Sequence, residues 1–188
     1  MKIFNEIFDW IGSIAVALVI AIFINAFIFQ PTRVAGPSMQ PTLQDQDYII
    51  ISKLSHTLSK APDYNDIVVI DSRVHRERSL KDDLMQPVTT YLNAYKPIID
   101  ADHSVWIKRI IGKPGDVLEF KDGKVYRNGI ALSEPYTKEP MLYSSDRKVT
   151  VPEGHVFVMG DNRNNSSDSR HIGSVPFDHV LGTMVYRF

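Results

Sequence analysis

Residues 11–29 read IGSIAVALVIAIFINAFIF, and this apolar run separates a short N-terminus, residues 1–10, from the rest of the chain. Its only polar side chains are Ser13 and Asn25, and Trp10 stands at its near edge. Nineteen residues of helix rise about 28 Å, close to the hydrocarbon thickness of a bilayer. A secretory signal peptide has a basic n-region and a shorter apolar core, and a buried soluble helix shows a polar face. We therefore expect residues 11–29 to form an uncleaved transmembrane anchor.

The composition allows a packed domain and argues against several classes of protein. Of the 188 residues, 44% are hydrophobic and 23% are charged, which is typical of a globular chain. The formal net charge of -1 lacks the basic surplus of nucleic-acid-binding proteins. There are no cysteines, which excludes disulfides and thiol catalysis, and the six histidines show no H-x-x-x-H spacing. We expect neither a metal ion nor a cofactor.

Beyond residue 30 the pattern changes to short strands separated by turns. Apolar runs at 48–51, 66–70, 105–111, 156–159 and 181–188 each predict a strand, and Asp122-Gly123 predicts a hairpin turn. The stretch 72–102 is polar and predicts a surface excursion, and residues 133–150 lack a regular pattern. The fold prediction is mainly β: an antiparallel sheet domain over 30–188, with a small inserted β-hairpin lobe at about 117–155.

Ser38 stands in a turn constrained by Gly36 and Pro37, within the run GPSMQPTL at 36–43. A serine hydroxyl becomes a nucleophile only with an adjacent base, and its reaction needs donors for the oxyanion. Gly36 would let a substrate backbone approach closely, and the Ser38 N–H can face a substrate carbonyl. Loop serines more often make a simple turn hydrogen bond, so a lone serine favours that interpretation, and the catalytic one depends on the flanking residues.

Lys108 is the candidate base. A general base must be neutral near the working pH, and burial of a lysine amine lowers its pKa. Trp106, Lys108 and Ile110 alternate along a predicted strand, so they share one face and Arg109 faces the other way. The competing interpretation is a Lys-Arg pair at a strand edge that only solvates a surface.

The run GDNRNNSSDSR at 160–170 is the third unusual stretch. Glycine, asparagine and serine in one run are typical of an ordinary polar loop. A buried neutral lysine also needs a hydrogen-bond acceptor, and Ser166 is a candidate for that role. Asp168 and Arg170 can pair and brace the loop. We do not expect Asp168 to be a third catalytic member, because a carboxylate beside Lys108 would raise the pKa of the amine.

The three stretches together resemble the motifs of bacterial type I signal peptidases, which are membrane-bound serine proteases. The matching residues are S-M-x-P-T-L from Ser38, K-R-I-I-G-x-P-G-D from Lys108, and G-D-N-R followed by S-x-D-S-R from Gly160. The resemblance implies a Ser/Lys dyad in which Lys108 takes the proton of Ser38 and later activates water. It assigns supporting roles to Ser166, Asp168 and Arg170. Relatives from the endoplasmic reticulum carry histidine where this chain has Lys108, so the lysine indicates the bacterial branch.

The resemblance implies a hydrolase that cleaves signal peptides from exported precursor proteins without metal or cofactor. It places the protein in the bacterial cell membrane as a single-pass protein, with the N-terminus cytoplasmic and the C-terminal domain outside. Ser38 lies nine residues beyond Phe29, a reach of about 30 Å at most, which holds the site near the bilayer. The expected partners are precursor proteins and lipid. Gly36, Pro37 and Met39 are the candidate oxyanion and substrate-binding residues.

Two departures and two alternatives accompany this interpretation. Some family members carry a serine two positions before the nucleophile, where this chain has Gly36, so a backbone N–H of Gly36 or Ser38 must stabilise the oxyanion. Asn65 stands where the family often shows glycine, and asparagine tolerates a positive φ. A soluble, self-cleaving Ser/Lys peptidase of the stress-repressor type is disfavoured by the anchor. A non-catalytic or narrowly specialised membrane-anchored assembly factor, for example for pilus or surface proteins, remains open.

Overall fold

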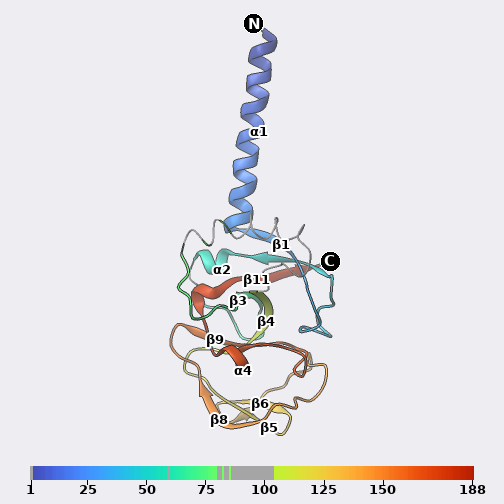
Figure 1. The fold of residues 1–188 in the computed structure, drawn as a ribbon, viewed down its shortest axis with the longest axis vertical. Helices are drawn as coiled ribbons and strands as arrows, with labels where there is room; N and C mark the ends of the chain where they lie inside the picture. The colour runs from blue at the N-terminus through green and yellow to red at the C-terminus, as the bar shows by residue number, and fades with distance from the viewer. Residues whose placement is uncertain (1, 59, 80–81, 83–84, 86–103) are drawn as a thin grey trace.

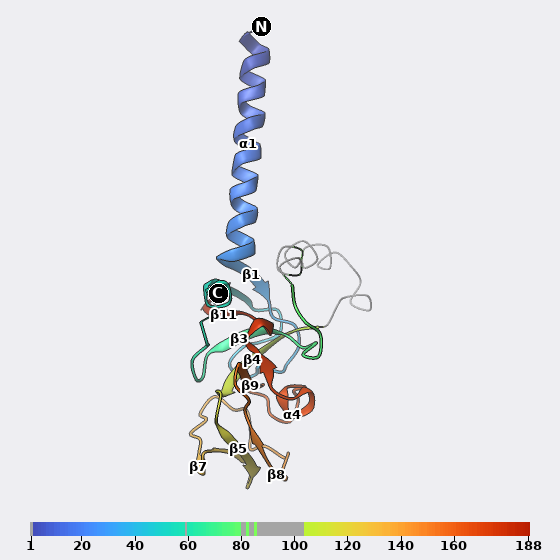
Figure 2. The ribbon, with the colours of Figure 1, turned by 90° about the vertical axis from the view of Figure 1, so that its left-hand side faces the viewer.

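The N-terminal helix α1 (Lys2–Phe27) extends away from the rest of the molecule (Figures 1 and 2). The computed structural model describes residues 2–58, 60–79, 82, 85 and 104–188. Within α1, the segment Asp9–Phe27 is long and apolar enough to cross a membrane, with a mean hydropathy of 2.3. The predicted span ran to Phe29, but the helix ends at Phe27. Phe29 instead begins strand β1 (Phe29–Arg33), because it pairs with Ser52 across the sheet.

In the described part of the chain, seven strands form the main sheet, in the order β1-β2-β11-β3-β4-β9-β10, and the paired strands are antiparallel. This confirms the mainly β, antiparallel prediction. Besides β1, the strands are β2 (Tyr48–Ser52), β3 (Ile67–Asp71), β4 (Val105–Gly112), β9 (His155–Met159), β10 (Val175–Pro176) and β11 (Val180–Arg187).

A smaller sheet lies at the end of the molecule farthest from α1 (Figures 1 and 2). Its strand order is β7-β6-β5-β8, formed by β5 (Val117–Lys121), β6 (Lys124–Arg127), β7 (Ile130–Ala131) and β8 (Ser145–Thr150). The predicted hairpin turn is present, with φ of 53° at Asp122 and 72° at Gly123. The prediction that 133–150 is irregular was wrong for β8, because this edge strand is mostly polar and exposed and carries no apolar alternation.

The remaining elements are short helices that the sequence did not predict: α2 (Leu54–Thr57), α4 (Ser169–Ile172) and the 3-10 turn η2 (Phe177–His179). Each is too short to show a 3.6-residue period. Most of the predicted surface excursion at 72–102 lies outside the described residues. Asn65 has a φ of 67°, so the turn before β3 takes the conformation expected of an asparagine in place of glycine.

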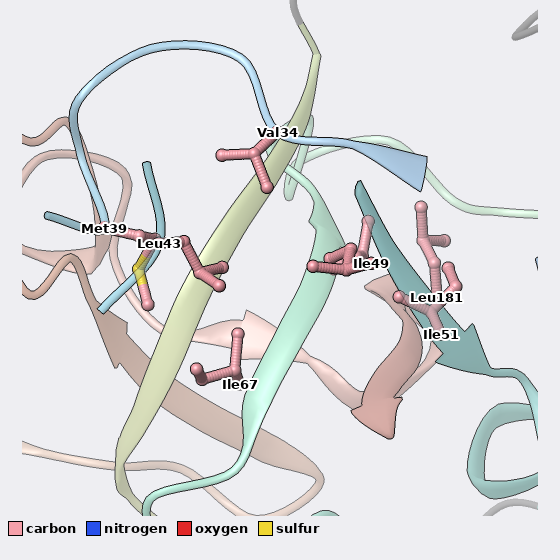
Figure 3. Packing of buried hydrophobic residues seen from close by; sticks show 8 residues of the cluster. Val34, Met39, Leu43, Ile49, Ile51, Ile67 and Leu181 are labelled. Atoms are coloured by element: carbon pink, nitrogen blue, oxygen red, sulfur yellow. The ribbon is translucent and has the colours of Figure 1, made fainter. Parts of the chain in front are cut away.

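The loop between β1 and β2 inserts the side chains of Val34, Met39 and Leu43 into the main core. Met39 and Leu43 are 1% and 0% exposed, and they pack in one cluster with Ile67 (Figure 3). Burial of each such side chain stabilises the fold by about 1.5–3 kcal/mol. Burial of Met39 thereby fixes the position of Ser38, the residue before it in the chain.

The register of the central strands places Lys108 in the middle of the sheet. Val68 on β3 pairs with Lys108 on β4, and Arg109 pairs with Met159 on β9. Gly160 follows Met159 directly, so the polar run 160–170 begins at the C-terminal end of β9, the strand that flanks β4. The Lys108 and Gly160 stretches, about fifty residues apart in sequence, are therefore neighbours in space.

Candidate active site

Ser38 lies within the loop between β1 and β2, and backbone hydrogen bonds join the two ends of this loop. Val34 N–H donates to the Asp47 carbonyl at 2.8 Å, and Gln46 N–H donates to the Val34 carbonyl at 2.9 Å. Within the loop, the Gly36 backbone has a φ of 84°, a conformation that glycine adopts without strain. The loop therefore presents a half-buried Ser38 on a constrained backbone.

Lys108 and Ser38 meet through their functional atoms. The Lys108 Nζ donates to Ser38 Oγ at 3.0 Å and to the Ile107 carbonyl at 3.0 Å. Lys108 is 3% exposed, and its Nζ lies 5.5 Å from the centroid of the Trp106 ring. The alternation along β4 predicted this aromatic neighbour. A buried amine in hydrogen-bond contact with a serine hydroxyl is the arrangement that nucleophile activation requires.

The electrostatic surroundings favour a neutral amine on Lys108. The pKa of Lys108 is lowered to about 8, mainly by burial. The carboxylates of Asp168 and Asp161 oppose this shift, and the positive charge of Arg170 contributes to it. With a pKa of about 8, about one molecule in ten is neutral at pH 7, compared with one in a few thousand for a free lysine. The site therefore supplies a usable base near neutral pH.

Asp168 lies close to Lys108, but its charge is paired. Burial alone would raise the pKa of Asp168, yet the Arg170 guanidinium holds it below its usual value. The Arg170 Nε donates to Asp168 Oδ1 and its Nη2 donates to Asp168 Oδ2, both at 2.8 Å. Asp168 Oδ2 also accepts the Gly160 N–H at 3.0 Å. The pair thus braces the loop, and Arg170 offsets much of the field that would recharge Lys108.

The turn at Gly160–Asn162 packs directly against Ser38. Asn162 donates its backbone N–H to the Ser38 carbonyl at 3.0 Å and its side-chain amide to the Pro37 carbonyl at 3.2 Å. A Cβ on Gly160 would lie 2.5 Å from the Ser38 carbonyl oxygen and 2.3 Å from Ser166 Oγ. Position 160 has no room for any side chain, and the turn fixes the backbone of Ser38 from behind.

The family model described as signal peptidase, peptidase S26, matches residues 7–188. The chain belongs to this family. Signal peptidase I of Bacillus licheniformis is 34% identical to it over 98% of this chain and 89% of the relative. Probable signal peptidase I-1 of a Synechocystis species is 35% identical over 95% of this chain and 80% of the relative. Membership identifies a serine peptidase, a hydrolase whose family cleaves signal peptides.

One solved structure, a signal peptidase I from Enterococcus faecalis, is 29% identical and covers 67% of this chain and 98% of that one, with a TM-score of 0.45. The family assignment rests on the sequence matches, which extend over nearly all of the chain.

Ser166 lies beside the site without contacting the lysine amine. Its hydroxyl is adjacent to Gly160 and donates to the Ser167 carbonyl at 3.4 Å. The hydrogen bonds that the Lys108 amine makes to described residues go to Ser38 and Ile107. The role of Ser166 as partner of Lys108 therefore stays a prediction.

The two candidate oxyanion donors differ in the structure. The Gly36 N–H donates to the Asp45 carboxylate at 2.8 Å, because the loop returns and brings Asp45 beside the turn. Pro37 has no N–H to offer. Of the two backbone donors expected from the sequence, the Ser38 N–H is the one that this contact leaves for a substrate. The Met39 side chain, expected near the substrate, packs into the core below the turn.

Sequence reasoning missed a buried network that joins all three stretches. The Arg109 Nε and Nη2 donate to the two Asp161 carboxylate oxygens at 2.8 and 2.6 Å. Thr42 Oγ1, in the nucleophile loop, donates to Asp161 Oδ2 at 2.5 Å. The sequence predicted that Arg109 faces away from Lys108, but it did not predict that Arg109 is buried. The available signal was that both motifs carry charged side chains of opposite sign, among them Arg109 and Asp161, and opposite charges favour an ion pair.

Proposed function

We propose that the chain is a membrane-anchored endopeptidase that cleaves signal peptides from exported precursors through a Ser38–Lys108 dyad and an acyl-enzyme. The observation that supports this most is the 3.0 Å contact between the buried Lys108 Nζ and Ser38 Oγ. The lowered pKa of Lys108, about 8, adds the second requirement, since only the neutral amine can accept a proton.

In the first half of the proposed reaction, neutral Lys108 takes the Ser38 hydroxyl proton as Oγ attacks the carbonyl carbon of the scissile peptide. The tetrahedral intermediate collapses when the C–N bond breaks, and Lys108 returns the proton to the leaving amine. The mature protein departs with this new N-terminus. The signal peptide remains as an ester on Ser38, and Lys108 is again neutral.

In the second half, Lys108 takes a proton from water, and the resulting hydroxide attacks the ester carbonyl. Collapse of this second intermediate breaks the C–O bond to Ser38. The proton on Lys108 returns to Oγ, and the signal peptide leaves with a free carboxyl group. The Ser38 N–H is the proposed oxyanion donor in both halves, since Gly36 is held by Asp45.

The proposed setting is the bacterial cell membrane, with residues 1–10 in the cytoplasm, one span formed by residues 11–29, and the β-rich domain from residue 30 outside. The apolar segment Asp9–Phe27 supports the span, and the short connection from Phe27 to Ser38 keeps the site near the bilayer. A precursor whose signal peptide lies in the membrane would present its cleavage site at this level. The small lobe around 117–155 is then the part farthest from the lipid.

The test uses the full chain in detergent with a precursor that carries a signal peptide. We expect wild type to release the mature protein, and Ser38→Ala and Lys108→Met to release none. The matched controls are Ser133→Ala and Lys124→Met, which alter exposed residues of the small lobe and should cleave like wild type. Cleavage by either dyad variant at the wild-type rate would contradict the dyad. Failure of wild type on several precursors would favour the non-catalytic assembly factor.

A further inference from the structure

Residues 134–142, which we call the strap, cross from the small sheet to the catalytic turn. They connect β7 to β8 but pair with neither sheet. Lys138 N–H donates to the Asp161 carbonyl at 3.2 Å, and Leu142 N–H donates to Asn164 Oδ1 at 2.8 Å. The Asn164 amide donates back to the Pro140 carbonyl at 3.0 Å. The strap is thus joined to the 161–164 turn along most of its length.

The strongest of these connections is a buried ion pair. The two Arg163 terminal nitrogens donate to Glu134 Oε2 and Oε1 at 2.8 and 2.6 Å, and the two side chains are 2% and 9% exposed. The Arg163 Nε donates to the Gly160 carbonyl at 3.0 Å. One guanidinium therefore links the carboxylate of the strap to the residue that packs against Ser38.

Tyr136 extends the connection to the strand that carries the base. Its ring centroid lies 4.0 Å from the Arg109 Cζ and 6.0 Å from the Arg163 Cζ. Its hydroxyl donates to Glu134 Oε1 at 3.0 Å. Burial raises the pKa of Tyr136 well above its usual value, so the phenol keeps its proton over the working range of pH. Tyr136 thereby fixes Glu134 and covers Arg109, the neighbour of Lys108.

We propose that Glu134 and Tyr136 are positioning residues for peptide cleavage, which hold the Gly160–Asn162 turn against Ser38 and Arg109 in place beside Lys108. Neither side chain contacts the dyad, and each acts through an arginine. The turn cannot shift without moving Ser38, because the Asn162 N–H donates to the Ser38 carbonyl and there is no free space beside Gly160. The small lobe is then a functional part of the active site. This inference rests on the proposed function.

The test compares Glu134→Gln and Tyr136→Phe with a control from the same strap, Glu139→Gln, whose side chain is exposed. Steady-state cleavage of a signal-peptide substrate by the full chain is measured well below the melting temperature of each variant. A misplacement of about 1 Å can cost about a hundredfold in rate, so we expect Glu134→Gln to lower kcat at least about tenfold with KM unchanged. Tyr136→Phe keeps the ring, so its kcat should fall by a smaller factor than that of Glu134→Gln, but by at least about threefold. Glu139→Gln should equal wild type.

A purely structural role would predict a lower melting temperature with kcat per folded molecule unchanged, and that result would overturn the inference. If Glu134→Gln does not fold, Tyr136→Phe decides, and a kcat equal to that of wild type would also overturn it. If wild type and Glu139→Gln both fail to cleave, the proposed function itself fails. Cleavage by these two with loss in the strap variants supports both.

Discussion

Adding one methyl group at Gly160 tests whether the turn behind Ser38 sets the catalytic geometry. In Gly160→Ala the new Cβ would lie 2.5 Å from the Ser38 carbonyl oxygen, whereas ordinary contacts begin at 3.4 Å. One of the two backbones must therefore move by up to about 0.9 Å. A displacement of that size costs about a hundredfold in rate, which corresponds to about 2.7 kcal/mol of transition-state stabilisation.

The matched control is Gly182→Ala in β11. A Cβ there would lie 2.6 Å from the Ser52 carbonyl oxygen, a backbone clash similar to that with Ser38, and it involves none of Ser38, Ser166 and Lys108. Both variants should lower the melting temperature. Only Gly160→Ala should lower kcat of the folded protein about a hundredfold.

The assay is cleavage of a signal-peptide substrate at a temperature where circular dichroism shows each variant to be folded. If Gly160→Ala cleaves within about threefold of wild type, the turn does not control the position of Ser38. If both variants lose activity equally, the loss reflects general destabilisation, and the argument from the geometry of the turn is refuted.

Three further predictions concern charge. Because the pKa of Lys108 is about 8, kcat/KM should rise about tenfold per pH unit below pH 7 and level off above pH 9; a flat profile from pH 6 to 9 would contradict a lysine base. The folded-state pKa lies below the unfolded value of 10.5, so protonated Lys108 destabilises the fold below pH 8, and this penalty fades as the pH rises toward 10.5. Lys108→Met should therefore raise the free energy of unfolding at pH 7, by up to about 3 kcal/mol, while activity is lost, and denaturant titration that shows a decrease would refute this. Asp161→Asn leaves buried Arg109 without its carboxylate and should cost about 3–5 kcal/mol, whereas Asp63→Asn, which breaks an exposed pair with Lys113, should cost less than about 1 kcal/mol in the same titration.

The parts of the fold that the sequence predicted are those that local patterns determine. The apolar run predicted the end of α1 to within two residues, although the helix begins at Lys2 and not at residue 11. The apolar strands and the Asp122-Gly123 turn each carry their own signal. Strand β8 carries no such signal, since SDRKVT is held in place by β5 and not by its own alternation. Short helices such as α4 depend on a cap, here Asp168, more than on periodicity.

The site was predictable in its residue types but not in its connections. The three motifs indicated Ser38 and Lys108, and strand alternation indicated an aromatic beside the amine. The hydrogen bond from Gly36 to Asp45 depends on how the loop between β1 and β2 folds back, which no local pattern fixes. The contact of Glu134 with Arg163 joins the strap to the 160–170 loop, and only the tertiary fold brings these residues together.

Charged residues from several parts of the chain surround Lys108 and determine the pKa of its amine. A buried amine stays neutral only if nearby carboxylates do not raise its pKa. Polar loops, however, are held in place by the hydrogen bonds that carboxylates accept. The structure meets both demands by pairing each acid with an arginine: Asp168 with Arg170, and Asp161 with Arg109. The guanidinium stays charged at any working pH, so these pairs keep their geometry while Lys108 gains and loses its proton. A catalytic lysine in a loop-rich site therefore depends on arginines that never take part in the reaction.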